Sequence, residues 1–248
     1  MYVGDSAAGR QPTGLSIVLP TYNERGHIRA LLTAIASVMD QALVPFEVVV
    51  VDDASPDRTA DEAAAVADAR VRVLVRHRER GLATALRHGI EHSQGRALLL
   101  MDADFNHQPA DIPRLYSALQ AADIVVGSRV LPGGGMQGPP WRFWSSWLVN
   151  AVIRAAGGSR VRDNTSGFLC FTRDVLAGLD ADKLFIGYGD YCIRLLHACQ
   201  SRGLRIVEVP VVYGRRRSGG SKTRFLWYAW QCLRTVREIR APARPSVD

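Results

Sequence analysis

Short apolar runs that end at polar turns recur through the first half of the chain. They cover residues 15–20, 46–51, 71–75, 97–101 and 123–126. Runs of this length between turn signals are typical of buried strands in a parallel sheet. Helical patterns separate the runs, and this alternation predicts an α/β fold with a mostly parallel sheet flanked by helices.

The helices between the strands have recognisable beginnings. The first is expected to run to about Met39, with Asn23 as its N-cap, because a short polar side chain there satisfies free backbone N–H groups. An alanine-rich helix follows Asp57, another covers 82–93, and a fourth follows Pro109. These four helices supply the crossovers that parallel strands require.

The second half is less regular, but no repeat or linker divides it from the first. A helix is predicted around 188–201 and a strand over 204–212. Residues 1–14 are small and polar and are predicted to be disordered. Residues 15–222 are predicted to form one domain, and residues 223–248 to add an amphipathic helix and a tail.

Two segments of the second half combine tryptophans with apolar residues at helical spacing. The first stripe consists of Trp144, Trp147, Leu148, Ala151, Val152 and Ala155. The second consists of Phe225, Leu226, Ala229, Cys232, Leu233, Val236 and Ile239. Each stripe is compatible with packing on the core or with lying in a membrane interface, and the sequence leaves both alternatives open.

Composition sets broad limits on this interpretation. With 248 residues and 47% hydrophobic content, the chain is long enough for a large core. The net charge of +7 is compatible with phosphate-rich ligands, anionic membranes or nucleic acid, so it does not select a partner. The four cysteines form no C-x-x-C pair and are expected to be buried thiols. No signal peptide is recognisable, and no apolar run approaches ~20 residues.

Acidic side chains follow three of the predicted strands. Glu24 follows the first strand, Asp52 and Asp53 end the second, and Asp102 and Asp104 end the run 97–101. Ligands of open α/β sheets bind outside the carboxyl ends of the strands, so these acids should converge on one crevice. Asp102 and Asp104 should face the same way if the strand continues, which suits a divalent cation that carries a phosphate ligand. The chain has no P-loop motif.

Several motifs, in this order and spacing, carry a family resemblance. They are Pro20-Thr-Tyr-Asn-Glu24, Val51-Asp-Asp-Ala-Ser-Pro-Asp57, Gly81-Leu-Ala, Asp102-Ala-Asp104, Val126-Gly-Ser-Arg129, Asp163-Asn-Thr-Ser-Gly-Phe168 and Arg216-x-x-Gly219-x-Ser221-Lys222. The sequence resembles family-2 glycosyltransferases of the GT-A fold, and more narrowly the dolichol- or polyprenyl-phosphate mannose synthases. The resemblance covers about residues 15–222.

The resemblance implies roles for individual residues. The donor nucleotide would be bound by Pro20, Tyr22, Glu24, Asp52, Asp53, Asp102 and Ala103. A Mg²⁺ or Mn²⁺ ion would be held by Asp102, Asp104 and Asn106. The catalytic set would be Asp104, Asp190, Arg129 and Arg216. The acceptor phosphate would contact Arg129, Ser221 and Lys222.

The function implied is the inverting, metal-dependent transfer of a hexose to a polyprenyl phosphate, with GDP-mannose as the favoured donor. A phosphate acceptor is already anionic and needs no general base, whereas a hydroxyl acceptor would need one, and Asp190 is the candidate. Without a transmembrane span, the enzyme would contact the cytoplasmic face of the membrane peripherally. The alternative is a soluble small-molecule or peptide acceptor. Nucleic acid is not an expected partner, because acids at three strand ends would repel it.

Two further motifs have competing interpretations. His88-Gly-Ile-Glu-His92 matches the H-x-x-E-H zinc motif, but no later acid is spaced as a third ligand. The run Arg215-Arg-Arg217 is compatible with a solvated or nucleic-acid-binding face. Its position in a glycine-rich loop favours phosphate binding instead.

Overall fold

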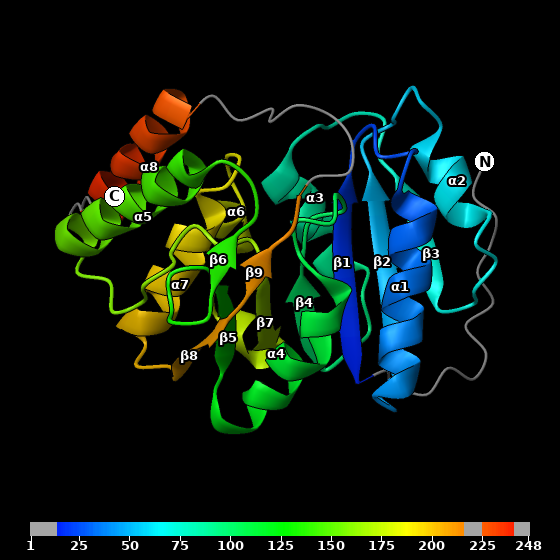
Figure 1. Cartoon of the computed structure of the whole chain (residues 1–248), viewed down its shortest axis with the longest axis horizontal. Helices are drawn as coiled ribbons and strands as arrows, with labels where there is room; N and C mark the ends of the chain where they lie inside the picture. Colours follow the sequence, from blue (N-terminus) through cyan, green and yellow to red (C-terminus); the bar gives the residue numbers. More distant parts are fainter. Residues whose placement is uncertain (1–13, 216–224, 241–248) are drawn as a thin grey trace, which may run out of the picture.

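The computed structural model describes residues 14–215 and 225–240, and the structural statements below concern these residues. Its centre is a seven-stranded sheet in the order β3-β2-β1-β4-β7-β5-β8 (Figure 1). The strands are β1 Leu15–Thr21, β2 Phe46–Asp52, β3 Val71–Val75, β4 Ala97–Leu100, β5 Ile124–Ser128, β7 Leu169–Thr172 and β8 Ile206–Pro210. All neighbours pair in parallel except β7, which is antiparallel to β4 and β5. The predicted mostly parallel sheet is confirmed.

A second, two-stranded sheet pairs β6 (Gly135–Met136) with β9 (Val212–Tyr213) in parallel. The strand predicted over 204–212 is therefore divided between the two sheets, because β8 ends at Pro210. The backbone N–H of Gly214, directly after β9, donates to the carbonyl of Asn106 at 2.8 Å. The end of β9 in the small sheet is thus held against the loop that follows β4.

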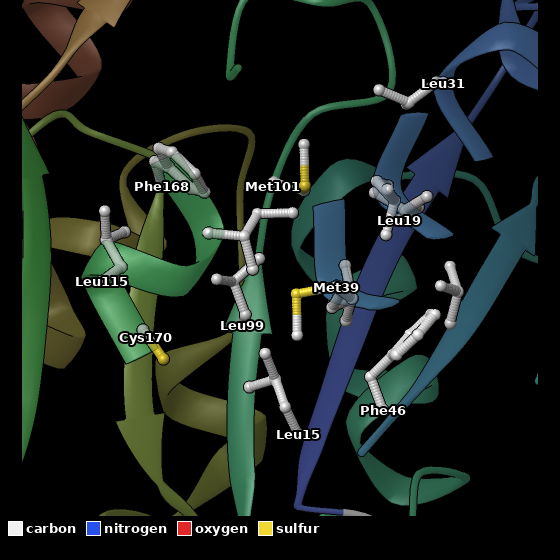
Figure 2. Close-up of a cluster of buried hydrophobic side chains, with 14 of the residues drawn as sticks. Leu15, Leu19, Leu31, Met39, Phe46, Leu99, Met101, Leu115, Phe168 and Cys170 are labelled. Carbon is white, nitrogen blue, oxygen red and sulfur yellow. The ribbon is translucent and has the colours of Figure 1, made fainter. Parts of the chain in front are cut away.

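Helices cover both faces of the large sheet. α1 (Ile28–Gln41) and α4 (Ile112–Ala118) pack on one face, and α3 (Leu82–Glu91) and α7 (Tyr191–Ser201) on the other. Figure 2 shows the first of these two cores, in which Leu15 and Leu99 of the strands lie near Met39 of α1. Shorter helical segments are α2 Thr59–Ala64, α6 Ala181–Leu184 and the 3₁₀ turns η1 Pro109–Asp111, η2 Leu119–Ala121 and η3 Arg173–Leu176.

The predicted N-cap of the first helix is wrong. Helix α1 begins at Ile28 with His27 at the N-cap position, four residues later than Asn23 would place it. Asn23 instead has a left-handed backbone with φ of 61°, which suits the turn that follows β1. Its backbone N–H donates to Ser55 Oγ at 3.0 Å, so the turn is fixed by the neighbouring loop.

The two tryptophan-bearing helices lie side by side at one end of the molecule (Figure 1). They are α5 (Pro140–Gly157) and α8 (Phe225–Arg240), and a small apolar cluster of Ile153, Ile193, Cys232 and Val236 joins them to α7. None of the helices in the described residues combines the length and apolar composition needed to cross a bilayer.

The structure resolves the two alternatives for the apolar stripes differently in each helix. The stripe of α5 faces outward: Trp144, Trp147, Leu148 and Val152 are all exposed. On α8 the buried part of the predicted stripe, Cys232 and Val236, packs inward. The exposed apolar residues of α8 are Trp227 and Trp230, together with Leu233 of the predicted stripe. The prediction that the whole apolar stripe of α8 faces a membrane is therefore wrong, since Cys232 and Val236 of that stripe belong to the core.

Gly89 allows the close packing of α3 on the sheet and provides a test of it. A methyl group on Gly89 would overlap Val18 Cγ1 and lie 3.0 Å from Val51 Cγ2. Gly89→Ala is expected to destabilise the fold by about 1–3 kcal/mol, although helix propensity alone predicts a gain of about 1 kcal/mol. Urea unfolding measures this difference. Gly26→Ala is the control, because nothing lies within 4 Å of its added methyl group. A Gly89→Ala variant as stable as wild type would contradict the packing.

Candidate active site

A cavity of about 710 Å³ opens at the carboxyl ends of β1, β2 and β4. The residues of its lining that the sequence singled out are Pro20, Tyr22, Glu24, Asp53, Asp102, Ala103, Asp104 and Asn106. Aromatic and apolar residues of the second half of the chain also line it, namely Met136, Trp141, Val149, Tyr188, Tyr191, Tyr213 and Tyr228. Helices α5 and α8 contribute to this lining, so the cavity combines acidic groups that follow the strands with aromatic groups from distant segments.

The acids after β4 lie in a loop and not on a strand, because β4 ends at Leu100. Asp104 is almost fully buried; its Oδ1 accepts from the backbone N of Asn106 and its Oδ2 from Asn106 Nδ2, each at 3.0 Å. The Asp102 side chain is one-third exposed. The expected strand-like orientation of the two acids is therefore wrong, but the loop still brings Asp102, Asp104 and Asn106 to the cavity. These oxygen donors fit a hard cation such as Mg²⁺ or Mn²⁺.

The loops that carry these residues contain strained backbone positions. Phe105 has a φ of 63°, Ala54 of 51° and Asn23 of 61°, and each lies in the loop after a central strand. A bulky residue in the left-handed region is costly and persists only where its surroundings require it. Phe105 is buried, and its carbonyl accepts from Gln108 Nε2 at 2.7 Å. The conformation of the Asp104 loop is thus set by packing.

His107 supports the same loop and was not identified from the sequence. Its Nδ1 accepts from the backbone N–H of Asp102 at 2.8 Å. Its ring stacks on Phe168 with centroids 4.7 Å apart and meets Tyr213 edge-on at 4.6 Å. A histidine next to Asn106 carries no sequence signal of this role, because the two aromatic partners come from distant segments.

The two aspartates at the end of β2 have different environments. Asp52 is fully buried and accepts from Thr21 Oγ1 at 2.9 Å and from Ser55 N at 2.8 Å. It is not among the residues that line the cavity. Asp53 does line the cavity, and its carboxylate accepts from Arg76 Nε at 2.7 Å and from Gly81 N at 2.9 Å. Asp52 therefore shapes its loop, whereas Asp53 ties the start of α3 to the cavity.

Arg129 lines the cavity in a buried ion pair with Asp163. Its Nε donates to Asp163 Oδ2 at 2.8 Å and its Nη2 to Asp163 Oδ1 at 2.6 Å. Burial opposes ionisation of Asp163, but the charge and hydrogen bonds of Arg129 hold the pKa of that carboxyl below its ordinary value. The pair stays ionised, and much of the Arg129 charge is offset within the protein.

Two further arginines at the cavity were missed by the sequence interpretation. Arg80 lies over the ring of Tyr22 at 4.9 Å from the centroid, and its Nη1 donates to the Tyr22 hydroxyl at 3.2 Å. Arg142 reaches the cavity from the first turns of α5. Neither forms an ion pair with an acid within residues 14–215 and 225–240. Only their position in the fold distinguishes them from the other arginines of the chain.

Asp190 faces away from the cavity. Its Oδ1 accepts from the backbone N of Tyr188 at 3.0 Å, and its Oδ2 accepts from Thr235 Oγ1 of α8 at 3.1 Å. Arg194 Nε lies 3.6 Å from Oδ2. The cavity is lined instead by the neighbours Gly189 and Tyr191. Three other predicted site residues, Arg216, Ser221 and Lys222, lie outside the described residues.

The H-x-x-E-H motif occupies the end of α3 and is not part of this cavity. Single ligand atoms of His88, Glu91 and His92 lie within 4.8 Å of one another. Glu91 also forms an ion pair with Arg87 at 3.4 Å, and His92 Nδ1 lies 2.8 Å from the carbonyl of His88. Gly89 within the motif is explained by the close packing of α3 on β1.

The family sequence model described as "Glycosyl transferase family 2" matches residues 16–180. The chain belongs to glycosyl transferase family 2. It is 38% identical over 213 residues to the undecaprenyl-phosphate mannosyltransferase of Micrococcus luteus, covering 83% of this chain and 85% of that protein. It is 34% identical over 230 residues to the polyprenol monophosphomannose synthase of Mycolicibacterium smegmatis, covering 88% of this chain and 84% of that protein. The chain is a glycosyltransferase, as the sequence predicted.

Other relatives bear on the fold. The chain is 31% identical to the dolichol-phosphate mannosyltransferase of Pyrococcus furiosus; the match covers 84% of this chain and 58% of that protein. The crystal structure of glucosyl-3-phosphoglycerate synthase from Mycobacterium tuberculosis, in complex with Mn²⁺, uridine diphosphate and phosphoglyceric acid, superposes with a TM-score of 0.70. It is 23% identical, and the match covers 91% of this chain and 78% of that one. The GT-A fold of this chain is thereby confirmed.

The candidate oxygen ligands in the loop after β4 allow a test of metal binding. Asp104→Asn removes a buried anionic oxygen from the cavity, so we expect Mn²⁺ affinity to fall at least about tenfold, or about 1.4 kcal/mol. Electron paramagnetic resonance of free Mn²⁺ measures this in the presence of GDP. Asp111→Asn is the matched control, because Asp111 lies near the same loop but outside the cavity. Equal Mn²⁺ affinity of Asp104→Asn and wild type would contradict the assignment.

Proposed function

We propose that the chain is an inverting, metal-dependent glycosyltransferase that transfers mannose from GDP-mannose to a polyprenyl phosphate. It would act as a peripheral protein at the cytoplasmic face of the membrane. The observation that carries this proposal is a single cavity lined by acids, arginines and aromatic side chains. Two helices that contribute to this lining, α5 and α8, also expose tryptophans.

The acids, Asn106 and the arginines that line the cavity suit a nucleoside diphosphate. Asp102, Asp104 and Asn106 would hold Mg²⁺ or Mn²⁺, which when bound stabilises the charge that develops on the leaving diphosphate. Arg80 packs against Tyr22 and offers a flat cationic surface next to the donor. The carboxylate of Asp53, oriented by Arg76 and the N–H of Gly81, remains at the cavity wall for a polar group of the nucleoside.

The basic residues around the cavity suit a phosphate acceptor. Arg142 on α5 lacks an acidic partner in the described part of the chain, and Arg129 is held nearby by Asp163. A phosphate monoester is already an anionic nucleophile, so its attack on the sugar needs no general base. The orientation of Asp190 toward Thr235 favours a role in fixing the turn before α7 over removal of a proton from the acceptor.

The relatives support the choice of sugar and acceptor. Those from Micrococcus luteus and Pyrococcus furiosus are named as mannosyltransferases for undecaprenyl phosphate and dolichol phosphate, respectively. The structural neighbours favour a second candidate, because one of them was crystallised with the soluble ligand phosphoglyceric acid. A soluble small molecule or peptide is therefore the alternative acceptor.

The outer sides of α5 and α8 support peripheral membrane contact. Trp141, Trp144 and Trp147 are exposed on α5, and Trp227 and Trp230 on α8. Exposed apolar patches of this kind mark binding surfaces, and tryptophans with neighbouring arginines suit the lipid interface. Arg234 and Arg237 on α8 are exposed as well.

The substrate assignment is tested with a donor panel. Radiolabelled GDP-mannose, UDP-glucose and other nucleotide sugars are incubated with a short polyprenyl phosphate or with soluble hydroxyl acceptors. We expect label from GDP-mannose to enter the organic phase in the presence of the polyprenyl phosphate and divalent cation. The matched control is the corresponding polyprenol without phosphate. Label that stays in the aqueous phase with every lipid acceptor, but is transferred to a soluble one, would establish the alternative.

The membrane surface is tested with charge substitutions on its exposed residues. Trp144→Glu and Trp230→Glu should each weaken co-sedimentation with anionic vesicles at least about tenfold, because each removes apolar area and adds a repelled charge. Leu43→Glu is the matched control, since Leu43 is 88% exposed and lies at the end of α1. Thermal unfolding verifies that the variants stay folded. Unchanged vesicle binding of both variants would exclude this surface.

A further inference from the structure

Asn150 is a buried polar residue on the helix whose exposed stripe carries the tryptophans. It is 1% exposed, while the adjacent turn of α5 presents Trp147 and Leu148 to the outside. Burial of a side-chain amide is costly unless its polar atoms find partners. Asn150 Nδ2 donates to Asp163 Oδ1 at 3.1 Å and to Thr165 Oγ1 at 3.0 Å. Its Oδ1 accepts from the backbone N of Asn164 at 2.7 Å.

These hydrogen bonds of Asn150 fix the carboxylate of Asp163, which in turn forms the ion pair with Arg129. Asp163 Oδ1 is shared between Asn150 Nδ2 and Arg129 Nη2, and Asp163 Oδ2 accepts from Arg129 Nε. Arg129 Nη2 also donates to Thr165 Oγ1 at 2.8 Å. Asn150 therefore contacts both residues that orient the guanidinium. No hydrogen bond of Arg129 Nη1 is seen within the described residues, and the side chain lines the cavity.

We propose that Asn150 is a positioning residue for sugar transfer. It fixes Asp163 and Thr165 so that Arg129 presents Nη1 to a phosphate group in the cavity. The inference rests on the proposed function, because it takes a phosphate-bearing substrate as the partner of Arg129. Since Asn150 belongs to α5, the position of this helix and the geometry of phosphate binding are linked through one side chain.

The substitution Asn150→Asp tests this role with little change of shape. When ionised, the introduced carboxylate would face the carboxylate of Asp163 and compete for Arg129. When protonated, its O–H could donate to Asp163 and its carbonyl could accept from Asn164 N, as the amide does. Burial and Asp163 favour the protonated form, and Arg129 opposes it. Other titratable groups near the pair are Tyr213, against Arg129, and Glu208, which accepts from the N–H of Asp163. Tyr228 and Cys192 also interact electrostatically with the pair.

The expected result is a pH-dependent defect. Above the pKa of the introduced carboxyl group, kcat/KM for mannose transfer to a short polyprenyl phosphate should be about ten- to hundredfold below wild type. As the pH falls from about 8 to about 5.5, the ratio of the variant to wild type should rise, because protonation restores the donor. Ile153→Ala is the matched control. It removes packing from the next turn of α5 but no polar contact, so it should lower the melting temperature without this pH dependence.

Binding provides a readout that does not depend on transfer. Affinity for farnesyl phosphate, measured by calorimetry, should show the same pH-dependent loss in Asn150→Asp. If wild type transfers sugar and binds farnesyl phosphate but the pH profiles of Asn150→Asp and wild type are parallel, the positioning role is overturned. If wild type binds farnesyl phosphate without transferring mannose to any lipid acceptor, the proposed function fails, and the binding profiles of the variant still decide the role of Asn150.

Discussion

The parallel pairing of β1 with both β2 and β4 is the constraint on which the site depends. The register sets Thr21 of β1 opposite Asp52 of β2, and Val18 of β1 opposite Leu100 of β4. Since parallel strands run in the same direction, the loops after all three begin at one edge of the sheet. That geometry brings Tyr22, Asp53 and Asp104 to one cavity although long stretches of chain separate them.

The charged side chains at the cavity fall into two groups, those in buried ion pairs and those that line the cavity outside such pairs. Asp53 and Asp163 are each satisfied by a buried arginine, Arg76 and Arg129, in hydrogen-bonded pairs that avoid the cost of an isolated buried charge. Asp102, Asp104, Arg80 and Arg142 also face the cavity, and the described residues provide neither arginine with an acidic partner. A divalent cation and a diphosphate would complement the two sets together. The paired charges shape the walls, Asn106 orients the carboxylate of Asp104, and Arg80 and Arg142 line the same cavity.

Helices α5 and α8 contribute to the cavity on one side and expose tryptophans on the other. Their inner sides contribute Arg142 and Tyr228 to the cavity, and burial raises the pKa of Tyr228, so its hydroxyl stays protonated. Their outer sides expose tryptophans. Buried polar contacts join both helices to the site, Asn150 to Asp163 and Thr235 to Asp190. A surface suited to lipid and a cavity suited to phosphate therefore share the same two helices.

The sequence by itself determined the α/β class, the strand Val71–Val75, the strand-end acids and the family. These follow from local patterns, because apolar runs and motif spacing record which residues are buried and which end a strand. Tertiary structure decided the antiparallel insertion of β7, the Arg129–Asp163 pair, the contact of Asp190 with Thr235 and the burial of Cys232 on α8. Each of these depends on a partner from a distant segment. Periodicity marks an apolar face, but only the packed chain determines whether that face is covered, as at Cys232 of α8, or exposed, as at Trp144 of α5.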